Sequence, residues 1–156
     1  MPFVKAKIIK ASKRNVEHTL MDWEVYPPSI YNALKRLDNY KQIREIIITE
    51  NGAAFDDSYE DDRIDDYKRV KFLQDYIAQV LLAKREGVKV NGYFVWTLLD
   101  NFEWAEGYYP KFGLVNVDFK TQRRTVKNSG RWYSQFLKNT LAASGEMWDE
   151  QSIRTM

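Results

Sequence analysis

The stretch Ile46-Ile47-Ile48-Thr49-Glu50-Asn51-Gly52 combines a short apolar run, a carboxylate and a turn signal. Residues 45–49 predict a strand that is apolar on both faces, which is typical of parallel sheets covered on both sides. Glu50 then lies just beyond the carboxyl end of that strand, where the ligand crevice of such sheets is found. On position alone, the simpler interpretation of Glu50 is a polar residue that begins a loop, because Asn51-Gly52 favours a turn in either case.

A second apolar run, residues 90–98, predicts another buried strand and leads into a motif rich in aromatic and acidic residues. The motif begins at Trp96 and ends with Glu103 and Trp104. Aromatic rings pack against the C–H faces of sugars, and a carboxylate accepts hydrogen bonds from adjacent hydroxyls. The alternative is that both tryptophans pack in a core and that Glu103 is a solvated loop residue. For the whole set, beside Glu50, a carbohydrate site is favoured.

Along the sequence, a helix is predicted before, between and after these strands. The first is opened by Pro27-Pro28-Ser29, the second covers residues 62–86 and is closed by Gly87, and the last begins at Asn128. Residues 112–119 predict a short strand or hairpin arm before the last helix. The order helix, strand, helix, strand, helix indicates α/β units with parallel strands. Because no repeat or linker interrupts this order, we treat residues 1–156 as a single segment.

Several of these motifs, in this order, resemble the last third of glycoside hydrolase family 1, the β-glucosidase family. The resemblance extends from residues 22–27 to Trp132-Tyr133. Residues 49–52 resemble the nucleophile motif on the seventh barrel strand of the family, and residues 96–104 resemble the eighth strand with its sugar-binding loop. The fold that this implies is α/β, a partial (β/α)8 TIM barrel: a C-terminal segment with about the last two barrel strands and their helices.

The resemblance also implies roles for individual residues. Glu50 matches the nucleophile of a retaining enzyme, in which two carboxyl groups lie roughly 5 Å apart across the scissile bond. Glu103 matches a residue that holds sugar hydroxyls, with Trp96 and Trp104 shaping the pocket. Phe112 falls where the family has an aromatic side chain beside the sugar. The implied substrate is a β-glucoside or β-galactoside without phosphate, because the 6-phospho-glycosidase branch usually replaces Glu103.

One part of the family pattern does not occur in this sequence. The general acid/base of the family sits in an Asn-Glu-Pro motif, and no Asn-Glu-Pro is present. We therefore expect the chain to be the C-terminal portion of a retaining β-glucosidase that carries the nucleophile and part of the sugar pocket without the acid/base. Whether such a chain is an enzyme by itself stays open. The alternative is a catalytically inactive sugar-binding or interaction module.

Composition and charge exclude several other classes of function. The net charge of +2 lacks the excess of positive charge that is typical of nucleic-acid-binding proteins. The sequence has no cysteine, which excludes disulfides and thiol chemistry. No segment reaches the length of a membrane span, and a cytoplasmic location is expected. We expect no cofactor and no metal, because the acidic run of residues 56–66 suits a helix N-terminus better than a calcium loop. The basic run of residues 120–127 is interpreted as a solvated loop.

The partner expected for this chain follows from its two predicted central strands. Strands that are apolar on both faces need covering, and their open edges invite pairing. Besides a β-glucoside ligand, we therefore expect either self-association or a complementary N-terminal barrel chain.

Overall fold

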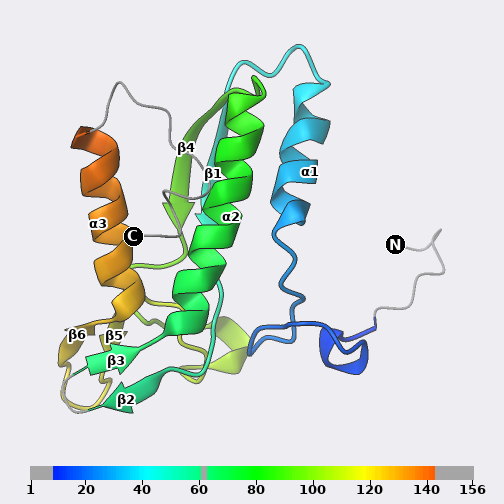
Figure 1. Ribbon diagram of the computed structural model, residues 1–156. Coiled ribbons are helices and arrows are strands. Elements are labelled where there is room, and N and C mark those ends of the chain that lie inside the picture. Colours follow the sequence, from blue (N-terminus) through cyan, green and yellow to red (C-terminus); the bar gives the residue numbers. More distant parts are fainter. Residues whose placement is uncertain (1–8, 61–62, 143–156) are drawn as a thin grey trace.

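The computed structural model describes residues 9–60 and 63–142 of the chain (Figure 1). Its body consists of three helices and two parallel strands, with two short antiparallel strand pairs at one end. The long elements are α1 (Pro28–Asp38), β1 (Ile46–Asn51), α2 (Tyr67–Arg85), β4 (Val90–Val95) and α3 (Asn128–Ala142). The short ones are η1 (Ala11–Lys13), β2 (Ser58–Glu60), β3 (Arg63–Asp65), η2 (Trp104–Glu106), β5 (Val115–Val117) and β6 (Arg124–Val126).

The central feature of the fold is the parallel pair of β1 and β4, connected by α2. The register sets Ile46 opposite Val90 and Ile48 opposite Tyr93, with two irregularities along the pair. This confirms the predicted α/β unit with parallel strands. The described residues form no closed barrel, because β1 and β4 make a sheet of two strands only.

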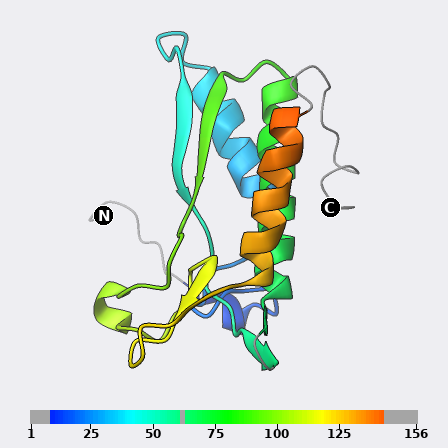
Figure 2. The same cartoon turned by 90° about the vertical axis from the view of Figure 1, so that its left-hand side faces the viewer.

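All three helices lie on the same side of the β1–β4 sheet (Figure 2). The covered face is apolar and includes Ile46, Ile48 and Tyr93, which pack against buried residues of the core. On the other face, Ile47 is 48% exposed and Phe94 is 60% exposed. The strands are thus apolar on both faces, as predicted, and the helices of the described residues cover only one of the two.

Helix α2 is at the centre of the core. Its buried side chains recur at helical spacing and therefore form one continuous face of the helix. One cluster includes the stacked rings of Phe72 and Tyr76, whose centroids are 4.1 Å apart, together with Phe136 of α3. A second cluster joins Val80 to Leu34 of α1. Burial of one such large apolar side chain contributes about 1.5–3 kcal/mol to folding. Helix α2 thus holds α1, α3 and the covered face of the sheet together.

The helix predicted over residues 62–86 begins later than expected. Strands β2 and β3 pair as a hairpin, and Asp66 then precedes the first residue of α2, Tyr67. Ile64, which lies within the predicted helix, is instead a buried residue of β3. The end of α2 agrees with the prediction. Gly87 has a φ of +92° and its N–H donates to the carbonyl of Lys84, which stops the helix.

The remaining predicted elements occur close to their expected positions. β5 pairs antiparallel with β6, so the segment predicted over residues 112–119 is the arm of a hairpin. α3 begins at Asn128, as its cap sequence predicts. Among the described residues, no helix has the length and apolar character needed to span a membrane.

Candidate functional site

A hollow of about 490 Å³ lies at the carboxyl ends of β1 and β4. It brings together all five predicted site residues, which are Glu50, Trp96, Glu103, Trp104 and Phe112. Glu50 is a residue of β1 itself and does not lie in the loop beyond it, because the strand continues to Asn51. Carboxyl ends of parallel strands are where α/β folds place their ligands. The geometry of the fold therefore supports a ligand site here.

The backbones of β1 and β4 approach each other closely beside Glu50. The N–H of Trp96 donates to the carbonyl of Asn51 at 3.0 Å. A Cβ atom added to Gly52 would lie 1.7 Å from the carbonyl oxygen of Trp96, which no side chain could accommodate. The glycine is therefore required by this approach, and it fixes the distance between the two strand ends.

The side chain of Asn51, next to Glu50 in β1, is bonded on the core side of the sheet. Its Oδ1 accepts a hydrogen bond of 2.7 Å from the hydroxyl of Tyr93, whose side chain packs against the core. Glu50, the residue before Asn51, is exposed although Ile48 packs against the core, because the pairing of β1 with β4 is irregular between Ile48 and Asn51 and interrupts the alternation of side chains. Burial raises the pKa of Tyr93, so that its phenol keeps the proton that it donates to Asn51.

The segment after β4 supplies three of the aromatic side chains of the hollow, Trp96, Trp104 and Phe112. Trp104 begins η2 and is 80% exposed, whereas Phe112 is almost fully buried. The N–H of Glu103 donates to the carbonyl of Gly107 at 2.7 Å, which closes the turn around η2. Phe112 is held beside the end of β4 because its carbonyl accepts from the N–H of Thr97 at 3.4 Å. Of these aromatic side chains, Phe112 is thus a buried wall and Trp104 an exposed one.

Several residues that line the hollow were not among the predicted site residues. They are Thr19, Trp23, Glu24, Asn51, Gly52, Phe72 and Tyr76. The ring of Trp23 lies 6.2 Å from that of Phe112, between centroids. Trp23 and Glu24 fall at the start of the resemblance, which gave them no role. Tyr76 lies among the buried residues of α2, and its position in the sequence is that of a core residue.

The charges around the hollow all have the same sign. Three carboxylates, of Glu24, Glu50 and Glu103, line it, and no lysine or arginine is among the described lining residues. Glu24 is paired with Arg14 at 2.7 Å. Neutral polyols can donate hydrogen bonds to such carboxylates, whereas an anionic ligand would be repelled.

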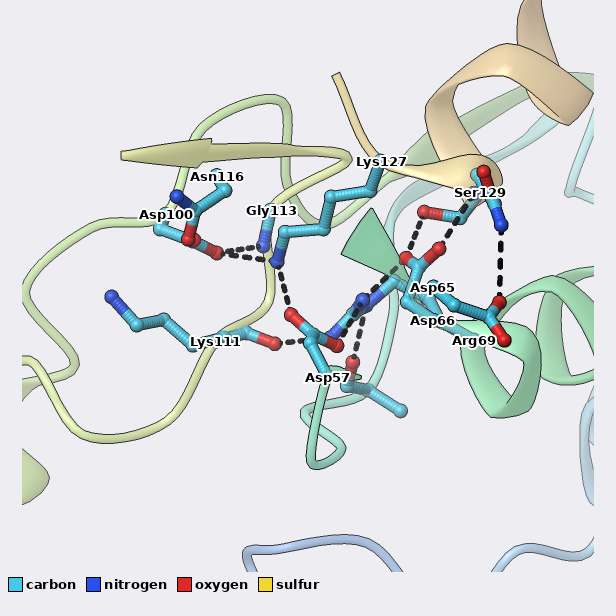
Figure 3. Close-up of polar contacts among 12 residues, drawn as sticks. Asp57, Asp65, Asp66, Arg69, Asp100, Lys111, Gly113, Asn116, Lys127 and Ser129 are labelled. Carbon is cyan, nitrogen blue, oxygen red and sulfur yellow. Dashed lines mark hydrogen bonds and ion pairs between the residues drawn. The ribbon is translucent and has the colours of Figure 1, made fainter. Parts of the chain in front are cut away.

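Two buried cations connect the loops that carry this site (Figure 3). The guanidinium of Arg69, on α2, donates to the carbonyl of Ala53 at 3.2 Å and to that of Lys111 at 2.5 Å. Ala53 follows Glu50 in the chain, and Lys111 precedes Phe112. One side chain therefore ties the loop after β1 to the loop after β4.

The second cation, Lys127, completes the network from the other side. Its Nζ lies 2.7 Å from Asp57 and 3.0 Å from Asp100. Asp57 also pairs with Arg69, at 2.9 Å. Asp100 accepts a hydrogen bond of 2.8 Å from the N–H of Gly113, next to Phe112. The side chains of Lys127, Asp57, Asp100 and Arg69 are at most 1% exposed.

This buried network corrects two predictions about charged segments. The acidic run of residues 56–66 was interpreted as favouring a helix N-terminus, and residues 120–127 as a solvated loop. Asp66 does precede α2, but its carboxylate is buried against Arg69, at 2.5 Å, and against Ser129. Lys127 is fully buried. These charged side chains are buried because the groups that pair with them lie on other elements of the fold.

The comparisons with known proteins agree with this geometry. The profile described as Glycosyl hydrolase family 1 matches residues 3–141. The chain belongs to glycosyl hydrolase family 1. It is 52% identical over 128 residues to Beta-glucosidase A of Thermotoga maritima, which covers 81% of this chain and 29% of the relative. It is 39% identical over 127 residues to a 6-phospho-beta-galactosidase of Clostridium acetobutylicum, covering 81% and 27%.

Solved structures of the family contain the same fold. A family 1 β-glucosidase from Thermotoga maritima matches with a TM-score of 0.78 and 51% identity, over 81% of this chain and 29% of that chain. Other solved structures of the Thermotoga maritima β-glucosidase are complexes with castanospermine and with glucoimidazole. The chain spans less than a third of the length of the family 1 relatives that it matches.

We predict that Lys127→Met lowers the free energy of unfolding by about 3–5 kcal/mol, because it leaves the carboxylates of Asp57 and Asp100 buried without this cation. Urea unfolding followed by circular dichroism measures the change. Lys120→Met is the matched control: this exposed lysine lies in the same segment and should change the free energy by at most about 0.5 kcal/mol. Equal effects of the two substitutions would contradict the role given to the network.

Proposed function

We propose that this chain contributes the nucleophile, Glu50, and part of the sugar pocket to a retaining β-glucosidase. The observation that carries the proposal is that Glu50 lies at the carboxyl end of a parallel strand and shares one hollow with Glu103 and the aromatic walls. Membership of family 1 supports a glycosidase reaction. The higher identity to β-glucosidases, 52% against 39% for the 6-phospho-β-galactosidase, supports a sugar without phosphate.

The proposed reaction has two steps. The carboxylate of Glu50 attacks the anomeric carbon and forms a glycosyl ester, while a second carboxyl group protonates the departing oxygen. That group then takes a proton from water, and the water oxygen replaces Glu50, so the configuration is retained. The sequence has no Asn-Glu-Pro, so we assign the second carboxyl group to no residue of this chain. Glu103 is given a different role, in sugar binding.

In this proposal, Glu103 accepts hydrogen bonds from two neighbouring hydroxyls of the sugar. The indoles of Trp96 and Trp104 and the ring of Phe112 form the walls against which the sugar packs. The exposure of Trp104 suits this role, because a bound sugar would cover a ring that is now 80% exposed. The absence of lysine and arginine from the described lining residues supports neutral over phosphorylated sugars.

The nucleophile can be identified by trapping. The chain is assembled with the part of the Thermotoga maritima relative that it does not span, and is treated with a 2-deoxy-2-fluoro-β-glucoside, which should accumulate as a glycosyl ester. Peptide mass spectrometry should find the label on the Glu50 peptide. Glu50→Gln should abolish labelling, whereas Glu103→Gln should retain the label on Glu50. A label on Glu103 would overturn the assignment.

The chain by itself should hydrolyse β-glucosides negligibly. A general acid contributes about 10²–10⁴-fold to such a rate, and the sequence does not contain the motif that supplies it. Release of glucose from cellobiose measures the activity, with the assembled protein as the positive control. Robust hydrolysis by the pure chain would contradict the prediction. Saturable glucose binding by the pure chain, with no hydrolysis after assembly, would favour the sugar-binding module instead.

The assembled protein should prefer plain glucosides to 6-phosphoglucosides. Like charges in a partly desolvated pocket repel, so the carboxylate of Glu103 should raise KM for the phosphorylated sugar. Comparison of kcat/KM for the two nitrophenyl glycosides tests this, and Glu103→Gln should reduce the preference. Glu106→Gln, an exposed residue of η2 outside the hollow, is the matched control. A preference of the unsubstituted protein for the phosphorylated glycoside would refute the role of Glu103.

A further inference from the structure

The sequence contains two Asn-Gly dipeptides, Asn51-Gly52 at the end of β1 and Asn91-Gly92 near the start of β4. In this dipeptide the main-chain nitrogen of glycine can attack the side-chain amide carbon of asparagine, because glycine has no side chain that hinders the approach. A C–N bond forms, and the side-chain nitrogen leaves as ammonia together with the proton of the glycine nitrogen. The resulting succinimide takes up one water molecule and opens to aspartate or isoaspartate.

Three contacts restrain Asn51-Gly52 beside the hollow. The Oδ1 of Asn51 accepts a hydrogen bond of 2.7 Å from the hydroxyl of Tyr93, and its main-chain carbonyl accepts one of 3.0 Å from the N–H of Trp96. That carbonyl belongs to the same planar peptide unit as the nitrogen of Gly52, so the second bond also holds the attacking atom. The carbonyl oxygen of Trp96 lies against the α-carbon of Gly52, where an added Cβ would be 1.7 Å from it. Attack at Asn51 therefore requires both hydrogen bonds to break.

The surroundings of Asn91-Gly92 are more open. The register sets Ile46 opposite Val90 and Ile47 opposite Gly92, so two steps along β4 match one step along β1. Asn91 is the extra residue of this irregularity, and such a residue is left out of the ladder. Asn91 is exposed, and its side-chain amide makes no hydrogen bond to any residue that the structure describes. Its amide carbon can therefore turn toward the nitrogen of Gly92.

The charges near the two dipeptides differ in the same direction. The reaction passes through an anionic intermediate and ends in a carboxylate, so a nearby cation favours it and a nearby anion opposes it. The Nζ of Lys84 donates to the carbonyl of Val90, the residue before Asn91, at 2.7 Å. Asn51 instead follows Glu50 directly, in a hollow lined by three carboxylates.

We propose that Asn91 is a site of spontaneous deamidation in this chain, and that Tyr93 protects the same dipeptide at Asn51-Gly52. The protection is needed because the close approach of the Trp96 carbonyl requires a glycine at position 52. Burial raises the pKa of Tyr93, so its hydroxyl stays a donor in the mildly alkaline solutions that accelerate deamidation. The proposal does not depend on the role given to Glu50.

The two dipeptides of the unsubstituted chain can be compared directly. The full chain is incubated in mildly alkaline buffer, and peptide mass spectrometry follows the conversion of each asparagine with time. Asn91 should be lost about tenfold or more faster than Asn51, because two hydrogen bonds must break before attack at Asn51. In concentrated urea, which removes these contacts, the two rates should become similar. Equal rates in the folded chain, or faster loss of Asn51, would overturn the proposal.

Isoaspartate at position 91 provides a second readout. A protein-isoaspartate methyltransferase transfers a methyl group from S-adenosylmethionine to the isoaspartate carboxylate, so the aged chain should be methylated on the peptide that contains residue 91. Asn91→Gln should abolish this methylation, because glutamine would have to close a larger ring, and it should leave the loss of Asn51 unchanged. Methylation at an undiminished level in Asn91→Gln would refute the site.

The role of Tyr93 is tested by removal of its hydroxyl. Tyr93→Phe should raise the rate of loss at Asn51 about fivefold, because one of the two restraining bonds is gone, and leave the rate at Asn91 unchanged. Tyr133→Phe is the matched control: its hydroxyl is also partly buried but is not bonded to Asn51, and neither rate should change. An unchanged rate at Asn51 in Tyr93→Phe would refute the protection. The comparison within the unsubstituted chain needs no variant, so it decides the deamidation site even if Tyr93→Phe unfolds the protein.

Discussion

Two buried cations, Arg69 and Lys127, hold the loops of this fold in their positions. They lie among the carboxylates of Asp57, Asp66 and Asp100, at distances of 2.5–3.0 Å. These side chains come from four separate parts of the chain, and their hydrogen bonds extend to the backbone on both sides of the hollow. Desolvation of such charges is unfavourable, and it is offset only when every partner is in place. The network therefore admits one arrangement of the loops and disfavours others.

The hollow at the strand ends is formed by the sheet and shaped by this network. Parallel pairing brings the carboxyl ends of β1 and β4 together, and the irregularity of this pairing between Ile48 and Asn51 leaves Glu50 exposed beside them. The ion network then holds the loop that carries Phe112, because Arg69 and Asp100 bond to its backbone on either side of that residue. The carboxylates and aromatic rings of the hollow are therefore positioned by charged groups that do not themselves line it.

Much of this architecture could be predicted from local sequence patterns. The apolar runs that became β1 and β4, the stripe of α2 and the glycine that ends it are signals within a few residues of each other. The ion network was not predictable in this way, because Lys127 and Asp57 are 70 residues apart and each looks like an ordinary surface charge in its own segment. The β2–β3 hairpin was missed for a related reason: each strand has three residues, too few to show an alternating pattern. The candidate site residues were predicted because the motifs resembled a family, and position alone would have left Glu50 as a loop residue.

The contact between Gly52 and the carbonyl of Trp96 has a consequence for how binding sites of this kind diversify. It involves main-chain atoms only, apart from the hydrogen that glycine has in place of a side chain. Exchange of the indole of Trp96 for another side chain would leave that carbonyl, and the spacing of the two strand ends, where they are. The scaffold thus separates two features of the hollow: the side chains of its walls can change while the carboxylate of Glu50 keeps its place.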